Sequence, residues 1–345
     1  MRLEIVPGTA IPGGGWVGSV LCHDVLGADG RPALGKGHRL DLADAATLSR
    51  FAPEELHVLW LGEEDVDENT AATRLAHAVA GPGVEIHPPT ESQARLTAAW
   101  RGVARVDSAT LAAVNGVEGI TVFTIADGAP VEAGRTLAGV KITAFGIPGS
   151  TLEAAELIAT SAPRGSTVTV RRFLPLRVSA VVRQRIDPAA RQRFEASLRQ
   201  RVDWFGGVVE SIEYPEDHTA TDGSALSAAA TADLLIVVGL ATVDPLESTW
   251  RGLLDAGAEV IRRGLPVHPG SSYWLVTFQG VPVIGVASCG MFSRRSALDL
   301  LLLRCFAGEP LDGEFLAGLG HGGLLGSEGS WRIPAYDRRV EVEER

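Results

Sequence analysis

The pattern of hydrophobic and polar positions is clearest at residues 233–257, where a short apolar run leads into a polar loop and a helix. Residues 234–238 are Leu, Leu, Ile, Val and Val, and they show no alternation. Such a run is typical of a strand buried on both faces of a parallel sheet. The run ends at Gly239, and hydroxyl and acidic side chains follow it. Because parallel sheets bind ligands at the carboxyl ends of their strands, this segment predicts a strand that feeds a ligand loop.

The pattern of hydrophobic and polar positions in the rest of the second half predicts strands that alternate with helices. We predict strands at residues 178–182, 208–214 and 234–238, a pair at 273–278 and 281–286, and helices from Asp187, from about Pro245 and from Ser293 to Phe306. Asp187 and Pro188 suit the start of the first helix, since Asp caps free N–H groups and Pro favours the first helical position. The helix should bury a stripe made of Phe194, Leu198, Val202 and Phe205. This rhythm predicts an α/β fold with a doubly wound, mainly parallel sheet.

The first half is less regular, and we expect a mixed α+β region there. A helix is indicated at residues 69–80, and residues 117–145 read as a small β-rich antiparallel module. Breakers at residues 161–175 favour a boundary near Leu176. The expected division is 1–175 for the N-terminal region, 176–312 for the α/β domain and 313–345 for a tail rich in glycine and charge. Much of that tail should lie over the surface.

Composition narrows the classes of protein that fit. The 345 residues are 46% hydrophobic, which is enough for two domains with real cores. No segment approaches the roughly 18 uninterrupted apolar residues of a membrane span. The net charge of -11, without any basic run, argues against a nucleic-acid partner. Three widely spaced cysteines exclude a disulfide framework. We therefore expect a soluble cytoplasmic protein with neither nucleic acid nor membrane as partner.

Glycines 13, 15 and 18 spell the dinucleotide fingerprint G-x-G-x-x-G. The fingerprint requires a preceding strand and a following helix whose N-terminus receives the pyrophosphate. Pro7 and Pro12 break the approach here, and Trp16 crowds the turn. A simple turn is the better interpretation.

Four loops of the second half carry candidate binding residues. The first holds Gly239, Thr242, Asp244 and Glu247; the second holds Pro269, Gly270 and Ser271; the third holds Ser288, Cys289, Gly290 and Arg294; the fourth holds Asp217. Small residues before a helix can bring backbone N–H groups to an anion, although they also allow close packing. Asp217 fits a helix cap as well as a ligand, and His268 fits a tight turn as well as an acid or base. At this level both alternatives stay open.

Together these loops resemble the molybdopterin-binding domain of molybdenum cofactor biosynthesis proteins, which molybdopterin adenylyltransferase and molybdopterin molybdotransferase share. GLATVDPLE (residues 239–247) stands where the family has GGVSVGxxD, HPGS (268–271) where it has a Pro-Gly turn, and VIGVASCGMF (283–292) where a strand leads to a Leu-Pro-Gly loop. Divergent members with Asp-x-x-Asp and Pro-Gly-Cys are more similar still. The resemblance extends to CHDVLGADGRPALGKGHRL (22–40), VEAGRTLAGVKI (131–142) and GLGHGGLL (318–325). It covers most of the chain.

The resemblance implies that the ligand is molybdopterin or its nucleotide form. A pterin has a guanidine-like edge that pairs with carboxylates such as Asp244 or Glu247, and its phosphate seeks backbone N–H groups. The same two acids would be the catalytic residues of a molybdate or nucleotide transfer. Mg²⁺ would take oxygen ligands from Asp217, Asp244 and Glu247. The family also implies a molybdoenzyme or another cofactor biosynthesis protein as partner, and assembly into a homo-oligomer.

Specific departures from the family pattern leave several functions open. Leu240 replaces a second glycine, Glu247 replaces aspartate, and Val286-Ala287-Ser288 replaces Leu-Pro-Gly. The Thr-Gly expected after the first strand of the domain is replaced by Arg183, Gln184 and Arg185, which could bind phosphate or face water. Binding of molybdopterin in synthesis, maturation or delivery of the cofactor is the leading hypothesis. A non-catalytic carrier or docking protein is the second, and an unrelated small-molecule hydrolase on the same fold is the third.

Overall fold

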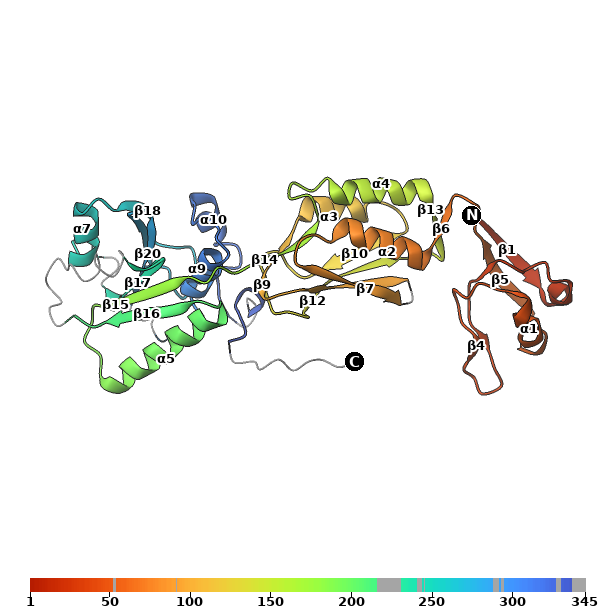
Figure 1. The fold of residues 1–345 in the computed structure, drawn as a ribbon, viewed down its shortest axis with the longest axis horizontal. Helices are drawn as coiled ribbons and strands as arrows, with labels where there is room; N and C mark the ends of the chain where they lie inside the picture. Colours follow the sequence, from red (N-terminus) through yellow and green to blue (C-terminus); the bar gives the residue numbers. More distant parts are fainter. Residues whose placement is uncertain are drawn as a thin grey trace. The chain divides into compact units, whose positions relative to one another are not determined.

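The computed structural model describes residues 1–51, 54–90, 92–215, 231–240, 244, 246–287, 292, 295–326 and 330–336. The chain forms two compact units (Figure 1). The first comprises Met1–Trp100, Ala104–Asp127 and Glu132–Val170, and the second comprises Arg101–Val103, Gly128–Val131 and Arg171–Arg345. Each unit is described by itself.

The first unit begins with a three-stranded antiparallel sheet in the order β1-β5-β2. The strands are β1 (Arg2–Pro7), β5 (Glu55–Trp60) and β2 (Val20–Leu21). One face packs on a core that includes Val6, Val58 and Trp16, together with Leu48 of α1 (Ala45–Phe51). Short elements complete this part: η1 (Gly8–Gly13), β3 (Val25–Leu26), β4 (Pro32–Leu34) and η2 (Leu42–Asp44). This sheet is therefore buried on one side by its own neighbours.

A four-stranded antiparallel sheet forms most of the rest of the first unit, in the order β10-β12-β8-β7. Its strands are β10 (Ile120–Thr124), β12 (Thr136–Ile142), β8 (Gln93–Ala98) and β7 (Val84–Thr90). The helix α2 (Glu68–Val79) packs on this sheet and on α4 (Gly149–Thr160), which also contacts α3 (Ser108–Asn115). The predicted helix at 69–80 is confirmed, and the predicted antiparallel pair near 117–145 is β10 with β12.

Two further small sheets are present. One has the order β11-β9-β14, with β11 (Pro130–Val131), β9 (Gly102–Val106) and β14 (Val168–Arg172). The other pairs β6 (Asp65–Asp67) with β13 (Gly146–Pro148).

The second unit is built on a six-stranded sheet in the order β16-β15-β17-β20-β19-β18. These strands are β15 (Arg177–Val182), β16 (Val208–Glu213), β17 (Leu234–Leu240), β18 (Glu259–Arg263), β19 (Trp274–Phe278) and β20 (Val281–Ala287). The pairs β16/β15, β15/β17 and β17/β20 are parallel, whereas β20/β19 and β19/β18 are antiparallel. A mixed α/β fold with several sheets is thus confirmed. Strand β18 was not predicted.

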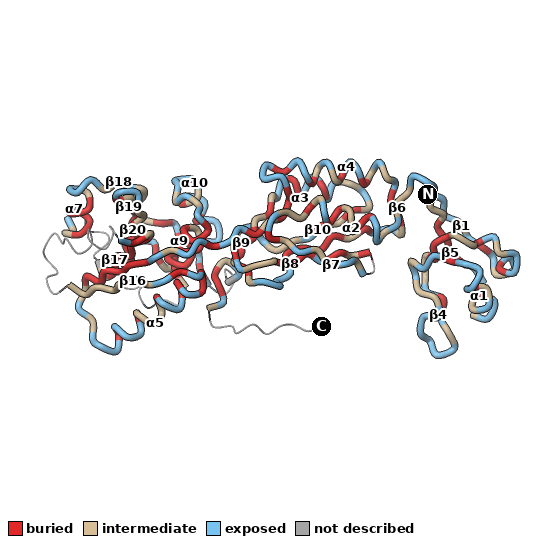
Figure 2. Tube along the Cα trace, viewed as in Figure 1, coloured by how far each residue is buried: buried red, intermediate tan, exposed pale blue. Residues whose placement is uncertain are grey.

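Both faces of this sheet are buried. Leu234, Ile236 and Val238 of β17 share a core with α5 (Pro188–Trp204) and α9 (Ala297–Phe306). Leu235 and Val237 point the other way, into a core with α7 (Ser248–Asp255). All five side chains are 0% exposed, and Figure 2 shows β15, β17 and β20 as the buried centre of the unit. The uninterrupted apolar run therefore predicted two-sided burial correctly.

Helix α5 begins as its sequence predicts, whereas α9 does not. The Asp187 carboxylate accepts a hydrogen bond from Ala190 N at 2.8 Å, with Pro188 as the first helical residue. Helix α9 begins at Ala297, with Ser296 as its cap, so the prediction that Ser293 opens this helix is wrong. The reason is a capping box one turn later, in which Asp299 Oδ2 accepts from Ser296 N at 2.8 Å.

The C-terminal region is more ordered than its composition indicates. It contains α10 (Gly313–Gly318) and η3 (Ser330–Arg332). Leu319, Leu325 and Ile333 are buried in the core that α5 and α9 share. These widely spaced apolar side chains anchor the region beside the two helices, whereas most of its other described residues are exposed, as expected of a tail that lies over the surface.

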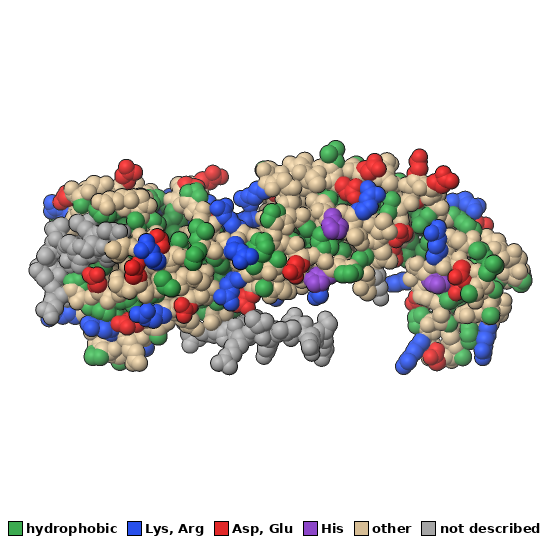
Figure 3. All heavy atoms as spheres, in the orientation of Figure 1, with side chains coloured by type: hydrophobic (Ala, Val, Ile, Leu, Met, Phe, Trp, Pro, Cys, Tyr) green, Lys and Arg blue, Asp and Glu red, His purple; other side chains and the backbone are tan. Residues whose placement is uncertain are grey.

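No described helix combines the length and apolar character needed to cross a bilayer. On the face drawn in Figure 3, acidic and basic side chains are interspersed over the described residues.

Candidate functional site

The strand register of the second unit brings several loops to one edge of its sheet. Val182 pairs with Val238 and Val238 pairs with Val286, so the parallel strands β15, β17 and β20 end side by side. Strand β19 runs the opposite way and starts at this edge, since Trp274 pairs with Gly285. The loops after β15, β17 and β20 and the loop before β19 therefore lie at the same carboxyl edge. This is the usual position of ligand sites in open α/β sheets.

Gly239 lets the loop after β15 approach the end of β17. Its φ is +91°, a left-handed conformation, and a Cβ placed on it would lie 2.6 Å from Cγ of Gln184. The neighbouring Arg183 is buried, donates its backbone N–H to Val238 O at 2.8 Å and reaches Ser248 Oγ with Nη2 at 3.2 Å. A side chain at position 239 would separate the two loops, so glycine is required here for packing as well as for backbone conformation.

The two candidate acids that the structure describes, Asp244 and Glu247, organise the start of α7. Asp244 is exposed, and its Oδ1 accepts from Leu246 N at 2.8 Å. Glu247 caps the helix, since its Oε2 accepts from Trp250 N at 2.8 Å, and Ser248 Oγ lies 3.4 Å from its Oε1. Both carboxylates therefore have a local structural role, and of the two Asp244 is the more accessible to a ligand.

The loop with Pro269, Gly270 and Ser271 is held against the start of α9. The His268–Pro269 peptide is cis, and Pro269 O accepts from Ala297 N at 2.9 Å. Gly270 has φ +122°, and a Cβ there would lie 2.4 Å from the Cβ of Ala297. Ser271 is exposed. The N–H groups of residues 296–299 are engaged by Pro269, Ser296 and Asp299. The anion site was predicted in the preceding loop at residues 288–290, which lie outside the described residues, so it stays a prediction.

The same loop is joined to the segment GLGHGGLL. His268 N donates to Gly323 O at 2.8 Å, and His268 O accepts from Leu325 N at 2.9 Å. A Cβ on Gly323 would lie 2.3 Å from Pro266 O, so glycine is needed for the close approach. His268 is thus fixed by its backbone while its side chain is exposed. Two segments that are far apart in the sequence meet here.

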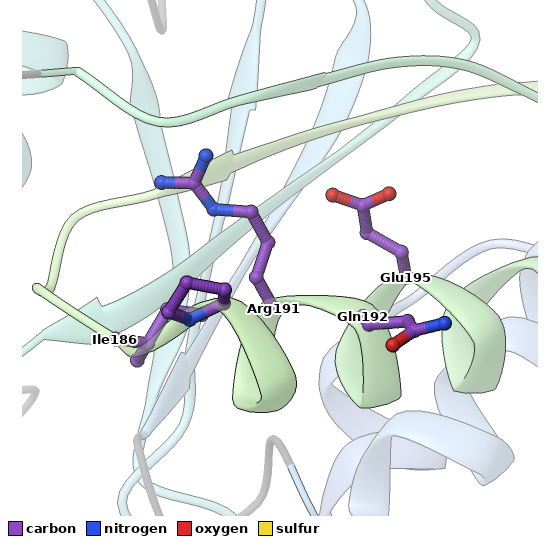
Figure 4. Close-up of a pocket in the computed structure, with 5 residues that line it drawn as sticks. Ile186, Arg191, Gln192 and Glu195 are labelled. Carbon is purple, nitrogen blue, oxygen red and sulfur yellow. The ribbon is translucent and has the colours of Figure 1, made fainter.

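A hollow of about 350 Å³ lies where the loop after β15 enters α5 (Figure 4). It is lined by Ile186, Pro188, Arg191, Gln192 and Glu195, and Figure 4 shows Arg191 and Glu195 projecting from the same side of the helix. Its size is at the lower end of the range for small-molecule sites. Pro188 was predicted only as the first residue of the helix, and the other four lining residues were not predicted as a site, although Arg191 and Glu195 are four apart on a predicted helix and so share a face.

Tyr214, at the end of β16, joins two of these side chains. The guanidinium of Arg191 lies 3.8 Å above the Tyr214 ring, and Tyr214 Oη donates to Glu195 Oε1 at 3.0 Å. Burial, and then the neighbouring Glu195 carboxylate, raise the pKa of Tyr214. The hydroxyl therefore stays protonated and remains a donor to Glu195.

A buried polar network joins the first turn of α9 to α5 and to the C-terminal region. Arg201 Nε of α5 donates to Asp299 Oδ1 at 2.8 Å, and Tyr336 Oη donates to the same oxygen at 2.9 Å. Burial, and then the Asp299 charge, raise the pKa of Tyr336 well above its usual value. This network was not predicted, although two signals for it are present: an arginine next to the apolar stripe of α5 and an aspartate three residues after Ser296.

Several predicted site residues lie outside the described residues: Asp217, Thr242, Ser288, Cys289, Gly290 and Arg294. Among the described residues, no group of three His, Cys, Asp or Glu side chains is arranged to hold a metal ion. The predicted Mg²⁺ set of Asp217, Asp244 and Glu247 includes one residue outside this description, so it stays a prediction.

Comparison with known proteins gives only distant similarity. No protein-family model matches the chain, and no curated protein matches it. It is similar to the crystal structure of a molybdopterin biosynthesis MoeA protein from Pyrococcus horikosii, at 12% identity and a TM-score of 0.27, over 71% of this chain and 81% of that chain. A molybdenum cofactor biosynthesis protein from Pyrococcus furiosus shows 13% identity and a TM-score of 0.22, over 90% of this chain and 66% of that one.

Proposed function

We propose that this chain binds molybdopterin or its nucleotide form at the carboxyl edge of a doubly wound sheet, in synthesis, maturation or delivery of the molybdenum cofactor. One observation carries the proposal. The loop after β17, the HPGS loop and the GLGHGGLL segment each resemble a molybdopterin-binding protein, and the structure supports a common location for the first two through strand register and for the last two through the hydrogen bonds of His268. Unrelated similarities along a chain would have no reason to converge in this way.

The acidic and basic side chains at this edge fit the chemistry of such a ligand. The exposed Asp244 carboxylate can accept hydrogen bonds from the guanidine-like edge of a pterin, while Oδ1 keeps its bond to Leu246 N. Arg185, exposed in the loop after β15, and Arg191 in the hollow supply positive charge for a phosphate. The ligand would bring the reactive dithiolene sulfurs, and the protein residues bind and orient it. Mg²⁺ belongs to the proposal as a hard cation between the phosphate and the acids Asp217, Asp244 and Glu247.

Equilibrium titration tests the proposal. The full chain is titrated with molybdopterin and with its adenylylated and cytidylylated forms, each with and without Mg²⁺ and molybdate, and binding is followed by pterin fluorescence. We expect saturable one-site binding of at least one form. Asp244→Asn should weaken it, and Asp255→Asn, an exposed acid at the far end of α7, should not. Lack of binding by every form under every condition would overturn the proposal.

A non-catalytic carrier is the second candidate, and the geometry of Glu247 favours it. The Glu247 side chain caps α7 through Trp250 N, so it is committed to structure in this conformation. A transferase would insert molybdate or transfer a nucleotide, and Asp244→Ala would abolish that turnover without unfolding the protein. A carrier would bind and release the cofactor unchanged and raise the rate at which an apo-molybdoenzyme is loaded. Turnover measured beside binding separates the two.

A further inference from the structure

The four-stranded sheet of the first unit has one face that packs on α2 and an opposite face that carries polar and aromatic side chains. Phe123 of β10, Gly139 of β12, Arg95 of β8 and His87 of β7 pair in one row across the four strands. Cross-strand neighbours share a face, and successive residues of a strand alternate between faces. Val140, next to Gly139, is buried on the side of the sheet that α2 covers (Figure 1). The row from Phe123 to His87 therefore lies on the opposite face.

The ring of Phe123 covers Gly139. A Cβ placed on Gly139 would lie 2.5 Å from Cε2 and 3.2 Å from Cε1 of Phe123, so only glycine leaves room for the ring over β12. Gly139 is buried, whereas Phe123 itself is 48% exposed. Contact with Gly139 accounts for one side of the ring, and the other side is accessible to a planar ligand.

The backbone beside Phe123 is held in place at the edge of the sheet. The side chain of Asn115, the last residue of α3, accepts from Val122 N at 2.6 Å and donates to Val122 O at 2.8 Å. These bonds satisfy the backbone groups of β10 that are directed away from β12. A ring that is positioned before binding loses little conformational freedom when a ligand stacks on it.

Positive charge lies on the same face as the ring. Arg95, on the strand next to Gly139, is exposed, and no hydrogen bond or ion pair engages its guanidinium within the part of the chain that the structure describes. Lys141 shares the face, because it lies two residues after Gly139 on β12. Glu85, an acid of this face, lies on β7 at the edge of the sheet farthest from Phe123. The charge beside the ring is therefore positive.

The spacing of the ring and the arginine suits one class of ligand. Adjacent strands lie about 4.8 Å apart, so Arg95 begins one strand away from the ring over Gly139. In a nucleotide, a sugar of about this width separates the flat base from the phosphate. A guanidinium binds phosphate through two parallel N–H···O bonds, and bases stack on aromatic side chains without regard to their sequence.

We propose that this face binds a mononucleotide, whose base stacks on the outer side of Phe123 and whose phosphate pairs with Arg95. The row holds one phenyl ring, and the chain carries a net charge of -11. Both favour one nucleotide over a nucleic-acid strand, because proteins that bind single strands use successive aromatic side chains along a basic groove. All of these residues belong to the first unit, so the proposal goes beyond the cofactor site of the second unit and does not depend on it.

Calorimetric titration of the full chain with AMP and GMP tests the site. We expect saturable binding of at least one of them, and at least roughly fivefold weaker binding of the matching nucleoside and of ribose 5-phosphate, which lack the phosphate or the base. Phe123→Leu should weaken nucleotide binding at least roughly fivefold, because it removes the stacking surface. Arg95→Gln should weaken it roughly tenfold. Phe123→Tyr keeps an aromatic ring and should keep the binding.

Controls separate this site from binding elsewhere on the chain. Arg31→Gln, at an exposed position of the same unit, matches the charge change of Arg95→Gln and should leave the affinity unaltered. Circular dichroism checks that each variant is folded. Lack of binding by both nucleotides, or binding that Phe123→Leu and Arg95→Gln both leave intact, would overturn the proposal. Equal affinity for the nucleotide and its nucleoside, or tighter binding of an oligoadenylate than of AMP, would overturn it as well.

Discussion

The three-stranded sheet of the first unit and the six-stranded sheet of the second unit differ in which parts of their strands are accessible. Strand β17 is buried on both faces between α5, α9 and α7, and the groups it presents lie beyond its carboxyl end. Strand β1 has one buried face, and the groups it presents lie along its length, at Leu3 and Ile5. Helices on both faces leave a parallel sheet only its strand ends for ligands, whereas a one-sided antiparallel sheet keeps an edge for another strand. The position of the proposed cofactor site follows from this difference.

The largest expected effect comes from the polar network behind the two-sided sheet. Asp299→Ala leaves the buried guanidinium of Arg201 without its carboxylate, and we expect a loss of about 3–5 kcal/mol in the free energy of unfolding. Denaturant unfolding measures it, with Asp255→Ala, an exposed acid of the same unit, as control. The double variant Arg201→Met/Asp299→Ala should recover part of the loss. A loss as small as that of the control would mean that this network does not stabilise the α5–α9 side.

A leucine-to-alanine substitution made in each sheet tests whether β17 is buried on both faces and β1 on one face. Leu235→Ala removes a fully buried side chain of β17 and should cost roughly 2–5 kcal/mol. Leu3→Ala, on the exposed face of β1, should change the free energy of unfolding of the monomer by no more than about 0.5 kcal/mol. Equal losses, measured by denaturant unfolding at concentrations where the chain is monomeric, would contradict the assignment of two-sided and one-sided burial.

The third prediction concerns the pH dependence of stability. In the unfolded chain Tyr336 ionises near its ordinary pKa of 10.0, but burial and then Asp299 raise this pKa in the folded protein. Its contribution to stability is thus complete below the unfolded pKa and declines as the pH rises from there toward the folded pKa. Unfolding measured between roughly pH 9 and 11 should show a steeper loss for the original chain than for Tyr336→Phe. Parallel curves would contradict the buried position of this hydroxyl.

Much of the second unit could be predicted from short-range signals. The cap and first turn of α5 depend on Asp187 and Pro188, and the burial of β17 depends on its own unbroken run, so local sequence was sufficient. Strand β18 was missed because its residues 259–263, EVIRR, are exposed or half-buried at the sheet edge, which removes the apolar signal. The start of α9 was misplaced because Ser293 and Ser296 are both plausible caps, and the choice depends on Asp299 and on Pro269.

The candidate site could be predicted only as a set of loops. Thr242, Asp217 and the residues 288–290 lie outside the described residues, so their roles stay predictions. The contacts that organise the described part join distant positions, such as His268 with Leu325 and Asp299 with Tyr336. The local sequence of a glycine-rich tail does not predict such contacts, because they depend on the packing of the whole unit.

Binding measured at the two ends of β17 tests the central claim most directly. Asp233 precedes the strand and pairs with Arg177, and Asp244 follows the strand at the proposed site. Molybdopterin and its nucleotide forms are titrated into the original chain, Asp244→Asn and Asp233→Asn under one set of conditions. We expect Asp244→Asn to weaken binding at least tenfold, about 1.4 kcal/mol, and Asp233→Asn to leave it unchanged. Equal affinities for all three proteins, or a loss confined to Asp233→Asn, would contradict a cofactor site at the carboxyl edge of this sheet.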